Sequence, residues 1–226
     1  MSATASALGA SSRRRWSVRL GIALVVAGLA LVGWVGWQYV GTNVVAHHRQ
    51  GQVIDDLEQG WADGHVEVSA AGTTSTAVVR IPRFGKDYRM PLLEGTSDEA
   101  LASGIGHLDA TAEPGDEGNV VLAAHRVTHG EPFADLPSLR PGDEVVVETA
   151  DATYTYVLDT GGDDLEVSFD ADWVLAPLPA NPDPGGVEPV QEPGQRLITL
   201  TTCAELFHTD ERLVAFGHLE STAPRG

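Results

Sequence analysis

Cysteine, arginine and histidine side chains at three points of the chain have the chemistry of nucleophilic catalysis. Cys203 is the only cysteine among 226 residues, and it follows an apolar, strand-like run at 196–202. Arg212 lies nine residues later and begins a second strand-like run, 212–219. If the two runs pair antiparallel, the end of the first lies beside the start of the second. A guanidinium there favours the reactive thiolate, and its rigid fork can also hold an oxyanion.

A cysteine nucleophile also needs a group that accepts and returns a proton, and histidine is the usual one near neutral pH. His125 directly follows the apolar run 119–124 and therefore also stands at a strand end. His208 lies between Cys203 and Arg212, so proximity in the sequence favours it instead. The residues alone leave both histidines as candidates, and position does not exclude His107, His129 or His218. A buried, structural cysteine is the alternative that involves no catalysis.

An uncharged segment near the N-terminus predicts a membrane anchor. Residues 20–40 are 21 positions without a charge, and a helix needs about 20 apolar residues to cross the hydrocarbon core. Residues 1–19 carry four arginines and no acidic residue, which favours a cytoplasmic N-terminal tail. We therefore predict a single-pass signal anchor in the plasma membrane with an extracellular domain. A signal peptide cleaved near 44–46 is the alternative, although its apolar region would typically be only about 7–15 residues long.

The charge of the remaining chain excludes some ligands. Outside the N-terminal tail there are 10 basic residues against 32 acidic ones, a formal net charge of −22. A domain this acidic repels nucleic acid and anionic lipid, so we expect neither as a ligand of the domain. A single cysteine excludes an internal disulfide and a thiolate-based zinc site. In an oxidising compartment, an unpaired cysteine is expected to be kept for its chemistry.

Short strand-like runs bounded by turn residues dominate the second half of the chain and predict an all-β, closed barrel with short helices. The runs are 77–82, 119–124, 144–149, 153–159, 196–202 and 212–219, with helical patterns limited to 97–104 and 133–139. Before them, 41–60 has the spacing of a short stalk or covering helix, and 62–77 has the composition of a linker. The Pro-, Gly- and acid-rich segment 160–195 is expected to be functional or mobile. Its Trp173, Leu175 and Leu178 are candidate substrate contacts, and the alternative is that they only pack the segment onto the barrel.

The residues around the cysteine resemble those of a known family. Thr199-Leu200-Thr201-Thr202-Cys203 is similar to the Thr-Leu-x-Thr-Cys signature of sortases, and the Cys…Arg pair fits their strand-to-strand arrangement. Further similar segments are Ile81-Pro82, PGDEGNVVLAAHR and Pro141-Gly142-Asp143, so that the resemblance covers about residues 78–220. Within the family, His125-Arg126-x-Thr128-His129-Gly130 most resembles class E enzymes of actinobacteria.

This resemblance implies a fold and a division of the chain. The fold would be a closed, eight-stranded sortase-type β-barrel with short helices, preceded by one transmembrane helix. The corresponding divisions are a cytoplasmic tail, the anchor, an extracytoplasmic stalk or linker, the catalytic domain and a C-terminal tail, at 1–19, 20–40, 41–77, 78–220 and 221–226.

The resemblance also implies a reaction and selects His125 over His208. Sortases cleave a C-terminal Leu-Pro-x-Thr-Gly-type sorting signal between Thr and Gly. The resemblance to class E implies a preference for Leu-Ala-x-Thr-Gly. Cys203 would form the thioacyl enzyme, His125 would transfer protons, Arg212 would hold the oxyanion, and Thr202 would help to position it. The partners would be secreted proteins bearing the signal and an amine of a peptidoglycan precursor or a pilin.

Two alternatives to this function remain at the level of sequence: a thiol hydrolase on the same scaffold, and a non-enzymatic anchored β-domain. Some sortases bind calcium through loop carboxylates, but the acidic residues of this chain lack the spacing of an EF-hand. The candidates would be Asp163, Asp164, Glu166, Glu113, Asp116 and Glu117. We predict no metal and no cofactor.

Overall fold

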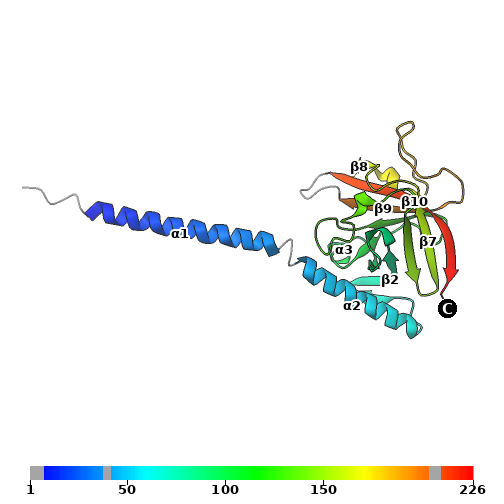
Figure 1. Ribbon diagram of the computed structural model, residues 1–226, viewed down its shortest axis with the longest axis horizontal. Helices are drawn as coiled ribbons and strands as arrows, with labels where there is room; N and C mark the ends of the chain where they lie inside the picture. The colour runs from blue at the N-terminus through cyan, green and yellow to red at the C-terminus, as the bar shows by residue number, and fades with distance from the viewer. Residues whose placement is uncertain (1–7, 38–41, 204–209, 226) are drawn as a thin grey trace, which may run out of the picture. The chain divides into compact units, whose positions relative to one another are not determined.

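The computed structural model describes residues 8–37, 42–203 and 210–225 (Figure 1). Two compact units divide the chain, Met1–Gly41 and Thr42–Gly226. The first unit consists of the helix α1, Leu8–Gly36. Within it, the 19 residues Val18–Gly36 have a mean hydropathy of 2.2 and are long and apolar enough to cross a membrane. This confirms the expected N-terminal apolar helix, although positions 38–40 of the predicted anchor lie outside the described residues.

Eight strands of the second unit pair into a closed ring, which confirms the predicted eight-stranded barrel. The ring runs β2-β3-β4-β5-β9-β10-β7-β6, and β6 pairs back onto β2. Its strands are β2 Thr73–Arg80, β3 Met90–Glu94, β4 Ile105–His107, β5 Gly118–Ala123, β6 Glu144–Thr149, β7 Ala152–Leu158, β9 Arg196–Cys203 and β10 Glu211–Pro224. Within the ring, the β3–β4 and β5–β9 pairs are parallel and the other pairs are antiparallel. Closure leaves this ring without free strand edges.

Alternation of side chains along each strand divides core from surface. In β5, Val120 and Leu122 point into the core of the barrel, whereas Val121 lies on the opposite face. In β9, Leu200 belongs to the same core, so that its neighbour Thr201 faces outward. The outward face of these two strands is where the chemistry-bearing residues can gather.

Short elements complete the unit. The helices are α3 Asp98–Leu101 and the 3₁₀ turns η2 Pro82–Phe84, η3 Leu136–Ser138 and η4 Asp172–Leu175. Two three-residue strands extend the ring: β1 Val68–Ala70 pairs with β2, and β8 Glu166–Ser168 pairs with β10.

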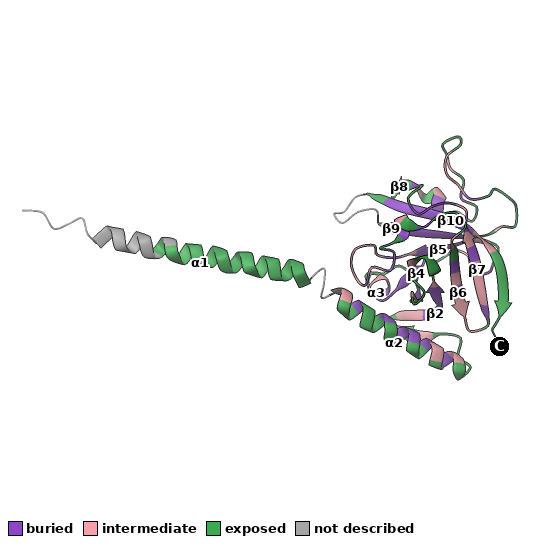
Figure 2. Cartoon of the chain, in the orientation of Figure 1, coloured by how far each residue is buried: buried purple, intermediate pink, exposed green. Residues whose placement is uncertain are grey.

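A long helix, α2, covers part of the barrel. It spans Thr42–Ala62, and its buried residues alternate with exposed ones along its length (Figure 2). Ile54 and Leu57 pack with Val78 of β2, and Trp61 packs against the same cluster. Arg225, just after β10, lies 4.2 Å above the Trp61 ring. The helical pattern predicted for 41–60 therefore corresponds to a helix packed on the barrel.

The structure corrects several boundaries. The linker predicted for 62–77 is wrong in its second part, because β1 and β2 already occupy Val68–Ala70 and Thr73–Arg80. The tail predicted from residue 221 is wrong because β10 continues to Pro224, which pairs with Ala152. The strands β3 and β4 were not predicted. One is a continuous apolar run without alternation and the other has only three residues, and both patterns are ambiguous in a sequence.

Candidate active site

The topology brings three strand ends to one edge of the barrel. β9 lies between β5 and β10, and it runs parallel to the first and antiparallel to the second. Parallel strands end at the same edge, so His125, just after β5, lies at the edge where Cys203 ends β9. In the antiparallel pair, Arg212 is directly opposite Cys203. The antiparallel pairing considered from the sequence is therefore present, and it sets the end of β9 beside the start of β10.

The structure describes Cys203 as the final residue of β9, and its side chain lies outside the described part of the chain. Residues 204–209 also lie outside it, and they include the rival histidine, His208. What the structure does describe is the backbone pairing of Cys203 and the surroundings of His125 and Arg212.

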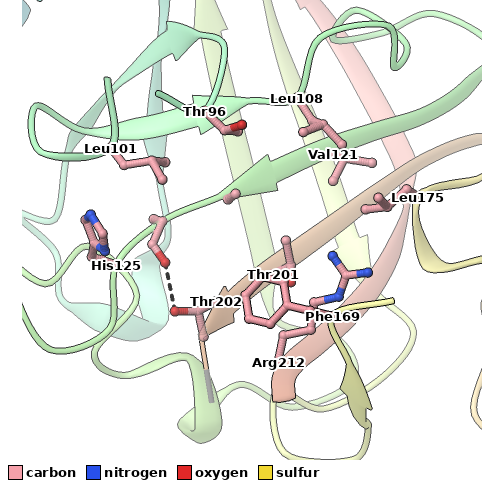
Figure 3. Close-up of a pocket in the computed structure, with 12 residues that line it drawn as sticks. Thr96, Leu101, Leu108, Val121, His125, Phe169, Leu175, Thr201, Thr202 and Arg212 are labelled. Carbon is pink, nitrogen blue, oxygen red and sulfur yellow. Dashed lines mark hydrogen bonds between the residues drawn. The ribbon is translucent and has the colours of Figure 1, made fainter. Parts of the chain in front are cut away.

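His125, Thr202 and Arg212 line the same pocket, which has a volume of about 240 Å³. Figure 3 shows Thr201 and Thr202 between His125 and Arg212, as expected from the order of the strands. Among the described residues, the lining consists of Thr96, Leu101, Leu108, Val121, Ala123, Ala124, His125, Phe169, Leu175, Thr201, Thr202 and Arg212. Most of the wall is apolar, so the few polar groups can orient a bound peptide.

Of the three apolar contacts predicted in the 160–195 segment, the structure places only Leu175 in the pocket wall. Trp173 packs instead against a second cluster, with its ring 6.0 Å from that of Phe216. Leu178 is 40% exposed and is not part of the described pocket lining.

The guanidinium of Arg212 is buried and held in place by its neighbours. Arg212 is only 6% exposed, its Nη2 donates to the carbonyl of Ala171 at 3.1 Å, and its Cζ lies 5.4 Å from the centre of the Phe169 ring. Both partners follow β8, which is fixed by pairing Val167 with Arg212 itself. Sequence reasoning missed Phe169, because only the β8–β10 pairing brings it to the arginine. The cation is thus anchored by a carbonyl and an aromatic face at the pocket wall.

His125 has an environment that favours the neutral imidazole. Burial and the charge of His129 lower the pKa of His125, and Asp98 opposes them only in part. The rings of His125 and His129 are 4.9 Å apart and tilted by 32°. A neutral imidazole can accept a proton from a thiol, as a general base must.

Thr202 and Thr201 make different uses of their hydroxyls. Thr202 is buried and donates through Oγ1 to the carbonyl of Ala124 at 2.8 Å, which ties the end of β9 to the residue before His125 (Figure 3). Thr201 lines the pocket, is 6% exposed, and its Oγ1 has no hydrogen-bond partner in the described part of the chain. Strand alternation is the signal in the sequence that could have identified Thr201, because its neighbour Leu200 is a core residue.

A group with metal-ligand chemistry lies outside the described pocket lining. Ligand atoms of Glu94, His107 and Glu113 fall within 4.8 Å of one another, and of the six acidic residues predicted as calcium candidates only Glu113 belongs to the group. His107 Nδ1 is 3.0 Å from Glu94 Oε2, and its Nε2 is 3.0 Å from the carbonyl of Ala112. Because both ring nitrogens have partners, the arrangement is satisfied as a buried ion pair.

This pair predicts a pH-dependent contribution to stability. Burial lowers the pKa of His107, but the hydrogen bond and charge interaction with Glu94, together with the Ala112 carbonyl and the charge of Glu113, outweigh burial, and the net shift is a rise above 6.5. The pKa of Glu94 falls below 4.5, chiefly through the hydrogen bond from His107. The contribution is therefore complete between the two unshifted values, 4.5 and 6.5. It disappears as the pH rises through the raised pKa of His107 or falls through the lowered pKa of Glu94.

We expect His107→Gln to reduce the free energy of unfolding by about 1–3 kcal/mol near pH 6 and by less near pH 9. Urea unfolding of the full-length protein in detergent at both pH values measures this difference. Glu94→Gln should follow the same trend. A loss that is equal at the two pH values would show that the pair is not ionised as described.

Comparisons with known proteins agree with the fold. A family model described as the sortase domain matches residues 79–220. Sortase SrtE1 of Streptomyces coelicolor is 33% identical over 215 residues, which are 91% of this chain and 58% of that protein. Sortase SrtE2 of the same organism is 28% identical over 221 residues, 90% of this chain and 81% of that protein. The chain therefore spans less than two thirds of the length of SrtE1.

Solved structures show the same barrel. Sortase E of Streptomyces avermitilis is 41% identical, with a TM-score of 0.57 over 66% of this chain and 90% of that one. Sortase E1 of Streptomyces coelicolor with a tripeptide in the active site is 33% identical, with a TM-score of 0.57 over 67% of this chain and 91% of that one. The chain belongs to the sortase family, and within it is similar to sortases E of Streptomyces.

Proposed function

We propose that the chain is a membrane-anchored transpeptidase that cleaves a C-terminal sorting signal and joins the cleaved protein to an amine. The observation that carries this proposal is the meeting of His125, Arg212 and the strand end bearing Cys203 at one pocket. Membership of the sortase family supports the same reaction class.

In the first half-reaction, Sγ of Cys203 attacks the carbonyl carbon of the threonine that precedes the scissile bond. The thiol proton passes to the neutral imidazole of His125, consistent with its lowered pKa. The guanidinium of Arg212 stabilises the negative oxygen of the tetrahedral intermediate. When the C–N bond breaks, His125 gives its proton to the departing glycine amine, and a thioester remains on Cys203.

In the second half-reaction, an incoming amine attacks the thioester carbon and loses a proton to His125. The C–S bond breaks, the new amide leaves, and His125 returns the proton to the thiolate of Cys203. If water replaces the amine, the same steps give only hydrolysis. Exclusion of water by the largely apolar pocket wall would favour transfer, since the thioester on Cys203 would persist until an amine arrives.

The apolar wall suits a signal of the Leu-Ala-x-Thr-Gly type. Leu101, Leu108 and Val121 surround the pocket and can bury a leucine side chain. The structure of Streptomyces coelicolor sortase E1 with a tripeptide in the active site supports a peptide in the equivalent pocket here. The acceptor amine would belong to a peptidoglycan precursor or a pilin.

A membrane anchor would serve this reaction. Three arginines precede the span Val18–Gly36 and Arg19 lies at its start, so we place the N-terminus in the cytoplasm and the barrel outside. Holding the enzyme in the same membrane as its protein substrate raises their effective concentration without any additional contact.

The test is a transfer assay with the full-length protein in detergent, a Leu-Ala-x-Thr-Gly peptide and a glycine-based amine, followed by mass spectrometry. We expect the peptide joined to the amine with the wild type and no product with Cys203→Ala. A product limited to the hydrolysed peptide would support the thiol hydrolase instead. An enzyme that cleaves equally well without Cys203 would contradict the proposal.

Arg212→Lys should lower kcat about 100-fold or more, because a point charge cannot replace a fork that stabilises an oxyanion. The matched control is Arg225→Lys, which alters another arginine stacked on an aromatic ring but outside the pocket. Steady-state rates of both variants check this expectation. A near-normal rate for Arg212→Lys would remove Arg212 from the oxyanion role.

Thr201→Val should raise KM for the peptide about 2–10-fold, the value of one hydrogen bond, because it removes a pocket hydroxyl while keeping the volume. Thr199→Val is the control: Thr199 lies on the same face of β9, but its hydroxyl donates to Asn119 at 2.8 Å. We expect that control to lower stability without changing KM. Equal KM values for Thr201→Val and the wild type would show that Thr201 does not contact the substrate.

A further inference from the structure

The segment that follows His125 has an unusual backbone. His129, Gly130 and Glu131 have φ angles of 56°, 82° and 52°, so three consecutive residues lie in the left-handed region. Two of them are not glycine and enter this region only at a cost in free energy. Such a conformation persists only where the surrounding structure holds it. The contacts of this segment therefore identify what holds it.

The helix α2 supplies those contacts. Asn43 accepts a hydrogen bond from the backbone N–H of Gly130 at 2.9 Å and donates one to Oε1 of Glu131 at 2.7 Å. Gln50 donates through Nε2 to the carbonyl of His129 at 3.2 Å. Each of the three left-handed residues is thus bonded to one of two side chains of α2.

The fit between α2 and the segment is tight. Gln50 is only 3% exposed, and a Cβ on Gly130 would come within 2.6 Å of Gln50 Nε2. Burying a glutamine removes its amide from water, which is unfavourable unless hydrogen bonds replace that water. Gln50 Oε1 has no partner among the described residues, so part of this unfavourable burial is not offset. Packing of α2 on the barrel therefore does not by itself explain a glutamine at this position.

The two halves of α2 make different contacts with the barrel through one face of the helix. Asn43 and Gln50 are seven residues apart, which is close to two turns, and Leu57 follows at the same spacing. Leu57 packs in the apolar cluster with Val78 of β2. The half of α2 that carries Asn43 and Gln50 instead contacts the segment that follows His125. Docking of α2 therefore has an apolar part that secures the helix and a polar part that acts on the segment.

The segment is connected to the imidazole of His125 in two ways. Its far end returns to the start, because the N–H of Phe133 donates to the carbonyl of His125 at 3.0 Å. Its middle carries His129, whose ring lies 4.9 Å from that of His125. A shift of the segment would therefore move the backbone of His125 and the His129 ring that packs beside the His125 imidazole.

We propose that α2 is a positioning element for His125: Asn43 and Gln50 fix the segment His129–Glu131, and the segment fixes the imidazole at the pocket. This inference rests on the proposed role of His125 in proton transfer. Neither Asn43 nor Gln50 touches the pocket, so both act through the segment. Because α2 begins at Thr42, soon after the span Val18–Gly36, the stretch of chain that leads from the anchor also positions the proton-transfer group.

The test compares Gln50→Ala and Asn43→Ala with Gln52→Ala in the full-length protein in phospholipid nanodiscs. Gln52 is the same residue type on the same helix, but it is exposed. We expect kcat to fall about 10-fold in the first two variants with KM within about 2-fold, because displacement of a proton-transfer group slows chemistry more than binding. Gln52→Ala should keep the wild-type rate. Hydrogen exchange of residues 126–134 should accelerate only in the first two variants.

A second control separates positioning from stability. Leu57→Ala removes an apolar contact of α2 distant from the histidine segment in the sequence and should lower stability with little effect on kcat at a temperature where the protein remains folded. An equal fall in kcat for Leu57→Ala and Gln50→Ala would overturn the proposal. It is also overturned if Gln50→Ala accelerates exchange but leaves kcat unchanged, or if it leaves exchange unchanged. A wild type without transfer activity would instead refute the proposed function, while the exchange data would still report on the contact.

Discussion

The pairing of β9 with a parallel neighbour on one side and an antiparallel neighbour on the other is the constraint on which the site depends. The parallel pairing with β5 ends both strands at one edge of the barrel, and the antiparallel pairing with β10 starts the third strand at the same edge. No two of Cys203, His125 and Arg212 need to be close in the sequence for this to work. The barrel closes by β6 pairing with β2, so the register of these strands has little freedom to slip.

Secondary contacts convert this coarse placement into a defined geometry. The hydroxyl of Thr202 joins the end of β9 to the carbonyl before His125, and Ala171 with Phe169 holds the guanidinium of Arg212. These contacts restrict the positions of His125 and Arg212 before any substrate arrives. An enzyme gains from such preorganisation, because its dipoles and charges need not rearrange as charge develops in the transition state.

The sequence was most informative where residue type and strand period coincide. The run that ends just before Cys203 and the run that begins with Arg212 could be paired correctly because both are short and largely apolar and few residues separate them. The choice of His125 over His208 needed the family resemblance, since proximity in the sequence favoured His208, which lies outside the described residues. Two contacts could not be predicted, that of Phe169 with Arg212 and that of Gln50 with His129. They join residues that are 43 and 79 positions apart in the sequence. Such contacts follow from tertiary packing, for which local pattern carries no signal.

A covalent intermediate on Cys203 is the most direct test of the account. The full-length protein would be mixed with a Leu-Ala-x-Thr-Gly peptide without an acceptor amine, quenched in acid, digested and mapped by tandem mass spectrometry. The account predicts an acyl group ending in the signal's threonine, attached to Cys203 as a thioester and lost on addition of the amine with formation of the transfer product. Cleaved peptide without any acyl adduct on Cys203, or an adduct on another residue, would contradict it.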